Sequence, residues 1–240
     1  MQIMKHIYTV LALALIALVI WQELFEQQNS ETSHPHKKPI QTYTTARTVF
    51  WESLYPQGGA TLYCQQQFIG PHGKGINVEH VFPMSWVTKA LNCGTRQQCR
   101  KNSEVFNQIE ADLHNLYPSR TDVNADRSSF RFGEVAGELR DYGETCDFEV
   151  SQRQRVVEPA PEVRGNIARS MFYMAYRYKA YGLRLFKKQG RLLATWHNLD
   201  RPNEQERSRN RQIETLQGNL NPFIDEPESL SRLLREGFFF

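Results

Sequence analysis

Glu79 and His80 place a carboxylate beside an imidazole in the stretch INVEHVFPMSW, which runs from Ile76 to Trp86. The flanking residues are apolar, as in a β-strand that ends near Pro83. A neutral imidazole can accept a proton at neutral pH, and a carboxylate can bind a metal ion. Because neighbouring residues of a regular strand point to opposite faces, both can serve one site only at a strand end or a bend. A satisfied histidine beside an exposed glutamate explains the dipeptide at least as well.

A second polar cluster lies in the stretch EADLHNLYPSRTDVNADRSSFRFGE, from Glu110 to Glu134. Apolar residues at helical spacing predict a helix from about Asn102, on which Glu110 and His114 would share a face. Downstream, DVNADR is predicted to be a turn, with Asn124 among several charged residues. Its alternating pattern is similar to a calcium loop but lacks the glycine and the distal glutamate of an EF-hand. A polar loop capped by its own side chains is the simpler alternative.

The four cysteines agree with an oxidising compartment, in which three pairings are open to them. The short segment CGTRQQC favours a disulfide between Cys93 and Cys99 and leaves Cys64 for Cys146. A zinc site is the alternative, but the sequence has no CxxC or HxxxH spacing to support it.

The N-terminus predicts export. Lys5 and His6 precede an uncharged apolar run at residues 7–21. A basic start followed by about 15 apolar residues is typical of a secretory segment, slightly shorter than the ~20 residues of a spanning helix. No small-x-small cleavage site follows, so residues 1–28 are predicted to be a signal peptide or an N-terminal membrane anchor. A buried core helix is the alternative. Residues 29–42 are polar and contain two prolines, which predicts a linker.

The remaining chain, residues 43–240, shows no internal repeat and no second linker, which predicts a single domain. ATLYC and the stretch around Glu79 predict strands, so the fold class is predicted to be α+β and predominantly helical. Further helices are predicted from cap and periodicity signals. Their ranges are Thr45–Tyr55, Pro161–Tyr181, Leu192–Leu199 and Asn203–Gly218.

The formal net charge of +3 fits an anionic partner without requiring one. Three arginines cluster near Asn124, where they would contact the backbone if the anionic partner is a nucleic acid, since phosphate contacts by Arg give sequence-independent affinity. They are Arg120, Arg127 and Arg131. Three more arginines alternate along the last long helix, where a solvated face is an equal alternative. These are Arg207, Arg209 and Arg211.

Four segments in order resemble the signature blocks of the bacterial endonuclease I family. They are NVEHVFPMSW, EADLHNLYPSRTDVNADRSSFRFGE, GNIARSMFYMAYRY and ERSRNRQIETLQGNLNPF. The similarity extends from about Tyr43 to Asp225. Members of this family are periplasmic or secreted nucleases of the ββα-metal, or His-metal finger, superfamily. The resemblance therefore implies a helical domain around a small ββα-metal finger motif.

The resemblance also implies a role for individual residues. His80 would be the general base that takes a proton from the attacking water. Glu79 and Asn124 would hold one divalent cation, taken to be Mg²⁺, which commonly keeps its waters and needs only one or two protein ligands. Glu110 would orient a water on the metal or support these ligands. Arg96 would face the phosphate, on a loop fixed by the disulfide between Cys93 and Cys99.

These roles predict an exported enzyme that hydrolyses DNA without sequence specificity and leaves 5′-phosphate and 3′-hydroxyl ends. RNA is a second candidate substrate. The protein is expected to act as a monomer in the periplasm or outside the cell, with residues 7–21 as a candidate attachment to the inner membrane. A membrane-tethered nucleic-acid-binding module without catalysis is the alternative function.

Overall fold

The computed structural model describes residues 40–239, and its fold is α+β, as predicted. The predicted signal peptide or anchor, and the predicted linker apart from residues 40–42, lie outside the described residues. Within residues 40–239, none of the helices combines the length and the apolar character that crossing a bilayer requires.

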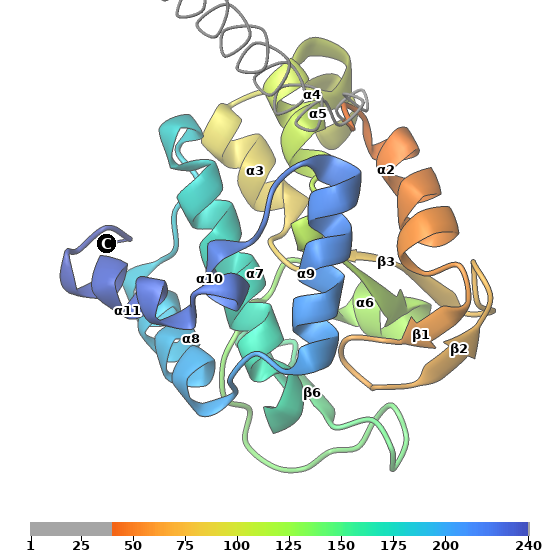
Figure 1. Cartoon of the computed structure of the whole chain (residues 1–240). Coiled ribbons are helices and arrows are strands. Elements are labelled where there is room, and N and C mark those ends of the chain that lie inside the picture. The colour runs from red at the N-terminus through yellow and green to blue at the C-terminus, as the bar shows by residue number, and fades with distance from the viewer. Residues whose placement is uncertain (1–39, 240) are drawn as a thin grey trace, which may run out of the picture. The chain divides into compact units, whose positions relative to one another are not determined.

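The helical part of the fold is arranged around α7, which lies between α8 and α9 (Figure 1). The aromatic interior of α7 forms part of the core, and the residues from Ile167 to Ala175 are buried. The helices of this part are α7 (Arg164–Arg177), α8 (Lys187–Leu199), α9 (Glu204–Gln217), α10 (Pro222–Asp225) and α11 (Pro227–Arg235). Short 3₁₀ turns at Pro161–Val163 and Lys179–Tyr181 flank α7, and α8 begins five residues before its predicted start at Leu192.

A buried ion pair joins α7 to α9. Arg169 donates from Nε to Glu206 Oε1 at 2.7 Å and from Nη2 to Glu206 Oε2 at 2.5 Å. Asn203 caps α9 by accepting a hydrogen bond from the Glu206 backbone N–H at 2.9 Å. The Glu206 side chain is used for the ion pair rather than for the reciprocal half of a capping box.

The part of the fold that contains the two polar clusters is an antiparallel strand pair followed by a helix. Strand β3 (Ile76–His80) pairs with β4 (Leu116–Arg120), and α6 (Thr121–Arg127) follows β4 directly. The chain between the strands forms α3 (Met84–Leu91), α4 (Arg96–Asn102), α5 (Glu104–Glu110) and a 3₁₀ turn at Leu113–Asn115. Strand β3 ends at His80, so the pair Glu79–His80 lies at a strand end.

The prediction of a turn at DVNADR was wrong, because this segment is helix α6. The Asp122 carboxylate accepts a hydrogen bond from the Val123 N–H at 2.9 Å, and its negative charge is favourable in the first turn of a helix. Val123 and Arg127 are both buried and lie four residues apart, so one face of α6 packs inward.

The prediction that Glu110 and His114 share a helix face was also wrong. Helix α5 ends at Glu110, and the Asp112 carboxylate then accepts a hydrogen bond from the His114 N–H at 3.0 Å, which starts a separate 3₁₀ turn. The His114 ring contacts the carbonyl oxygen of Asn219 at 2.9 Å and is buried, as a structural histidine would be.

Two further small sheets complete the fold. Strands β1 (Gly58–Ala60) and β2 (Gln67–Ile69) form a hairpin, and β7 (Val156–Pro159) lies between β5 (Arg131–Phe132) and β6 (Phe148–Ser151). The predicted strand ATLYC contributes only Ala60 to β1. The predicted helix Thr45–Tyr55 corresponds to helix α2 (Tyr43–Val49) and the π-helical segment Phe50–Leu54 that follows it.

Two disulfides link the chain, and no described cysteine is free. Cys64 pairs with Cys146 across 82 residues, whereas Cys93 pairs with Cys99 across six. The first disulfide links the segment after strand β1 to the residues just before strand β6. The second joins the loop after α3 to α4, the helix that begins with Arg96.

The difference in loop length predicts a difference in stability. A disulfide restricts the unfolded chain more when it closes a longer loop, so replacing Cys64 and Cys146 by Ser should cost about 4 kcal/mol and replacing Cys93 and Cys99 about 2 kcal/mol. Urea denaturation of the two double variants beside the wild type measures both losses. A larger loss for the Cys93–Cys99 variant would contradict this account.

Candidate active site

A cavity of about 580 Å³ brings together residues from five elements of the fold, which are α2, β3, α3, α4 and α6. Glu79 and His80 come from the end of β3, Asn124 from α6, Arg96 from the start of α4 and Tyr43 from the start of α2. Segments that are distant in sequence therefore meet at one opening, and Glu79, His80 and Asn124 of the two polar clusters are among its lining, whereas Glu110 is not.

The His80 imidazole is held in one tautomer. Its Nε2 lies 3.0 Å from the backbone carbonyl oxygen of Glu110, which can only accept, so Nε2 is the donor and Nδ1 has the free lone pair. Burial, followed by the positive charge of Arg96, lowers the pKa of His80 to about 4. The ring is therefore neutral around pH 7 and can accept a proton at Nδ1.

The Glu79 carboxylate is buried on the other face of the strand. Its Oε1 accepts a hydrogen bond from the Tyr63 hydroxyl at 2.7 Å and lies 3.3 Å from Arg127 Nε. Burial raises the pKa of Glu79, and the Arg127 charge and the Tyr63 hydrogen bond oppose that rise. Both contacts use Oε1, so neither occupies Oε2.

Asn124 is oriented by its amide nitrogen. Nδ2 donates to Asn77 Oδ1 at 2.8 Å and to the Val78 carbonyl oxygen at 3.3 Å. Because a backbone carbonyl only accepts, the Val78 contact identifies Nδ2 and leaves the oxygen, Oδ1, outside both bonds. One carboxylate oxygen and one amide oxygen in the same cavity are suitable donors for a hard divalent cation.

The Glu110 carboxylate contacts two arginines of α4, and its expected role in orienting a water on the metal or supporting the metal ligands stays a prediction. It is fully buried and accepts from Arg96 Nε at 2.5 Å, and from Arg100 Nε at 2.7 Å and Nη2 at 2.9 Å. Arg96 and Arg100 keep 44 % and 43 % of their side chains exposed. Arg96 uses only Nε in this contact, so its two terminal nitrogens can face the cavity. Glu110 thus positions Arg96 through its carboxylate and His80 through its backbone carbonyl.

The three arginines predicted to bind nucleic acid occupy different environments. Arg131 is exposed on β5, as a backbone contact would require. Arg120 is partly buried and pairs with Asp122 at 2.5 Å, while its Nη1 donates to the Tyr142 carbonyl oxygen at 2.8 Å. The Arg120 guanidinium therefore binds groups within the protein.

The expectation of a phosphate contact for Arg127 does not fit its burial, since only 1 % of its side chain is exposed. It pairs with Glu79 and donates to the carbonyl oxygen of Val81 at 2.5 Å. Its guanidinium also lies 4.9 Å from the centre of the Phe132 ring. Arg127 therefore compensates a buried carboxylate inside the protein.

Sequence reasoning did not identify Tyr63, Asn77 or Arg100 as residues of this site. Arg100 could have been found, because it follows Arg96 by four residues on a helix and so shares its face. No sequence signal connects Tyr63 to Glu79 or Asn77 to Asn124, because those contacts depend on tertiary packing.

A neutral base, an exposed arginine and two oxygen donors in one cavity are what metal-assisted hydrolysis of a phosphate ester requires. Comparison with known proteins agrees, since residues 25–228 match the endonuclease I family. The chain belongs to the endonuclease I family and is a nuclease.

Three of its relatives match between 49% and 84% of the chain. An extracellular deoxyribonuclease of Aeromonas hydrophila is 41% identical over 215 residues, which cover 80% of this chain and 91% of the relative. Endonuclease-1 of Buchnera aphidicola subsp. Acyrthosiphon pisum (strain APS) is 27% identical and covers 84% of this chain and 87% of its own length. An extracellular ribonuclease of Bacillus subtilis (strain 168) is 34% identical over 49% of this chain and 44% of its own length.

Burial of the Glu79–Arg127 pair predicts a large effect on stability. Arg127→Leu would leave the Glu79 carboxylate buried without its charge partner, and should lower the free energy of unfolding by about 3–5 kcal/mol. Arg131→Ala is the matched control at an exposed arginine, with an expected change within about 0.5 kcal/mol. Chemical denaturation measures both. Wild-type stability in Arg127→Leu would show that Arg127 does not compensate the buried Glu79 carboxylate.

Proposed function

We propose that the protein is an exported, Mg²⁺-dependent endonuclease that hydrolyses DNA without sequence specificity and leaves 5′-phosphate and 3′-hydroxyl ends. The observation that carries this proposal is the position of His80. Its neutral ring is held at Nε2 by the Glu110 carbonyl and lines the same cavity as Glu79, Asn124 and Arg96.

The residues divide the work of hydrolysis between them. His80 Nδ1 takes a proton from the attacking water and becomes an imidazolium, whose charge is offset by the nearby Glu110 carboxylate. The terminal nitrogens of Arg96 bind the non-bridging oxygens of the phosphate, where charge increases during the attack. Glu110 acts as a positioning residue for both, through its carbonyl and its carboxylate respectively.

Glu79 Oε2 and Asn124 Oδ1 would hold the cation. When bound, it would offset negative charge on the phosphate and on the departing 3′ oxygen. Strands β3 and β4 with helix α6 form the ββα-metal finger in this proposal, and the helices α3 to α5 are an insertion between its strands. The order strand, strand, helix and the position of Asn124 on that helix support the assignment.

The names of the relatives support the substrate and the compartment. The relatives from Aeromonas hydrophila are named extracellular and periplasmic deoxyribonucleases. Two Bacillus relatives are named extracellular ribonucleases, which favours RNA as a second substrate. Two disulfides agree with action outside the cytoplasm. Attachment to the inner membrane through residues 7–21 stays a prediction.

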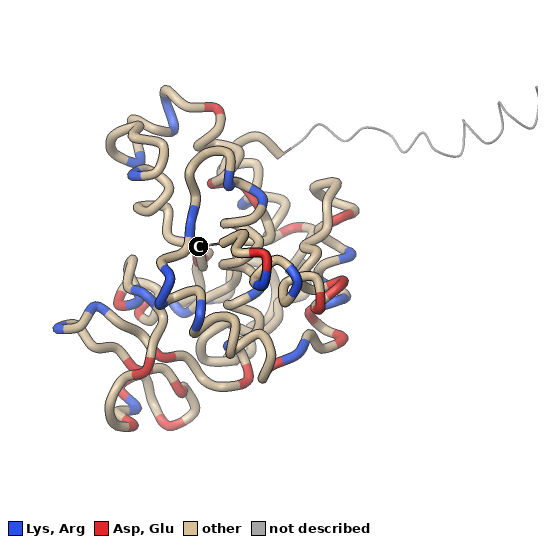
Figure 2. Tube along the Cα trace, turned by 90° about the vertical axis from the view of Figure 1, so that its left-hand side faces the viewer, with Lys and Arg blue, Asp and Glu red and all other residues tan. Residues whose placement is uncertain are grey.

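A second groove extends the surface on which nucleic acid could lie. Figure 2 shows Lys and Arg interspersed with Asp and Glu along the described trace. A groove of about 440 Å³ is lined by Arg131, Lys188 and Arg191, and Arg131 is two residues from Ser129 of the catalytic cavity in sequence. We infer that a strand held in the cavity continues along this groove through phosphate contacts.

Substitution of the proposed base should separate catalysis from binding. His80→Ala removes proton transfer, so nicking of a supercoiled plasmid in Mg²⁺ should fall by a factor of about 10²–10⁴, while binding of DNA persists. His197→Gln is the control, because His197 is a buried histidine whose ring contacts the Pro227 carbonyl oxygen outside the cavity. It should nick normally.

The same assay tests the cofactor and the products. EDTA should abolish nicking, and restored Mg²⁺ should recover it. DNA ligase should reseal the nicks without further treatment if the ends are 5′-phosphate and 3′-hydroxyl. Wild-type rates in His80→Ala, with binding unchanged, would show that the base is another residue.

Removal of the groove charges should weaken binding uniformly across sequences. In a His80→Ala background, replacing Arg131, Lys188 and Arg191 by Ala should reduce the slope of DNA affinity against salt concentration by about one for each cation that binds a phosphate. Arg211→Ala is the control, because Arg211 is exposed on α9 and lines neither groove. Fluorescence anisotropy at several salt concentrations measures the slopes, and equal slopes in all variants would exclude this path.

A further inference from the structure

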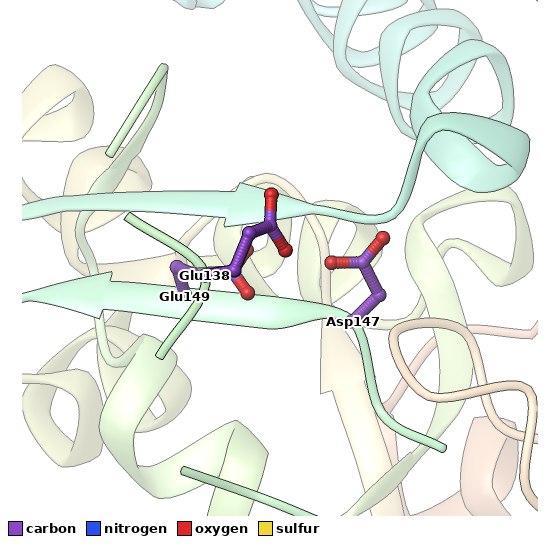
Figure 3. Close-up of side chains that lie close together, drawn as sticks. All are labelled: Glu138, Asp147 and Glu149. Carbon is purple, nitrogen blue, oxygen red and sulfur yellow. The ribbon is translucent and has the colours of Figure 1, made fainter. Parts of the chain in front are cut away.

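Acidic side chains gather where the loop 133–147 meets the sheet that contains β6. Glu149 lies on β6, Asp147 directly precedes this strand and Glu138 comes from the loop (Figure 3). One oxygen from each of the three lies within 4.8 Å of the others. Glu158 on β7 stands directly opposite Glu149 in the antiparallel register. Like charges in this position destabilise a sheet unless something compensates them.

The positive charge nearby does not match the acidic charge. Arg140 lies 3.1 Å from Glu138 and 3.3 Å from Asp147. Arg164 pairs with Glu158 at 2.8 Å. No ion pair within residues 40–239 includes Glu149. Two guanidinium groups therefore face a larger set of carboxylates, and the uncompensated member is the most buried of them.

The Glu149 carboxylate belongs to this cluster and has a buried oxygen without a hydrogen-bond partner among the described residues. Only 3 % of the residue is exposed, and the oxygen without a partner is Oε1. A buried carboxylate in this state requires either a proton or a cation.

We propose that Glu138, Asp147 and Glu149 form a second cation site, which takes Ca²⁺ and lies outside the catalytic cavity. Oxygens on opposite sides of one Ca²⁺ are ~4.6–5.2 Å apart, so the observed spacing fits three ligands of one ion. Mg²⁺ prefers fewer carboxylates and a stricter octahedron. The Glu138 side chain is 72 % exposed, which leaves room for water to complete the coordination.

The site would support the catalytic cavity through the loop. Tyr142, in the same loop, donates from its hydroxyl to Asp126 Oδ2 at 2.8 Å and accepts from Arg120 Nη1 at its carbonyl oxygen at 2.8 Å. Asp126 belongs to α6, the helix that also positions Asn124. Calcium held between the loop and β6 would thus stabilise a segment that packs against α6. This role is separate from the proposed hydrolysis.

Thermal unfolding of the full chain tests the site without nucleic acid. About 1 mM Ca²⁺ in place of EDTA should raise the Tm by about 3 °C, because the ion binds the folded state only. Glu149→Gln should remove this rise, and Glu138→Gln should weaken the apparent Ca²⁺ affinity about tenfold or more. Glu138 is exposed, so its variant is expected to fold even if the buried substitution is not tolerated.

The control separates this site from the catalytic one. Asn124→Ala removes a proposed ligand of the catalytic cation and should keep the full Ca²⁺-dependent rise in Tm. The proposal is overturned if the wild type shows no rise. It is equally overturned if Asn124→Ala abolishes the rise while Glu138→Gln and Glu149→Gln retain it. Neither result depends on nicking, so the proposed nuclease mechanism is tested separately.

Discussion

The candidate site depends on one buried side chain, Glu110. A carboxylate removed from water must be compensated, and three charge-assisted hydrogen bonds from Arg96 and Arg100 do so. The same residue presents its backbone carbonyl to His80 and so selects the tautomer of the base. Arg96 and His80 are therefore fixed relative to each other by a residue that contacts both. Its position at the end of α5 makes the length of that helix a constraint on the site.

Strand geometry explains why Glu79 and His80 can be neighbours and still have different environments. Successive side chains of β3 point to opposite faces, so Glu79 packs against Tyr63 and Arg127 while His80 packs against Tyr43 and the end of α5. The Glu79 carboxylate is compensated by Arg127 and Tyr63, and the His80 ring is bound by the Glu110 carbonyl, so the two side chains do not pair with each other. Because β3 ends at His80, both faces of the strand end open into one cavity.

The sequence was informative where local rules determine structure. Strand β3 and the capped start of α9 followed from periodicity and caps, and the α+β class followed from their sum. The sequence was uninformative where tertiary packing determines the local structure. The local pattern of DVNADR favours a turn, because its polar residues are typical of turns, whereas burial of Val123 and Arg127 in the fold stabilises α6 as a helix. The surroundings of Glu110 were inaccessible for the same reason, since its partners come from another helix.

Arginine content is a poor guide to the binding surface in this protein, because much of it has an internal role. Arg127 compensates Glu79, Arg169 compensates Glu206, and Arg209 donates to the carbonyl oxygens of Leu113 and Leu116. Each satisfies buried acceptors that would otherwise destabilise the fold. The formal net charge of +3 includes these residues, although they do not face a substrate. In the proposed mechanism, affinity for a phosphate backbone therefore depends on exposed cations, namely Arg96 at the cavity and Arg131, Lys188 and Arg191 in the second groove.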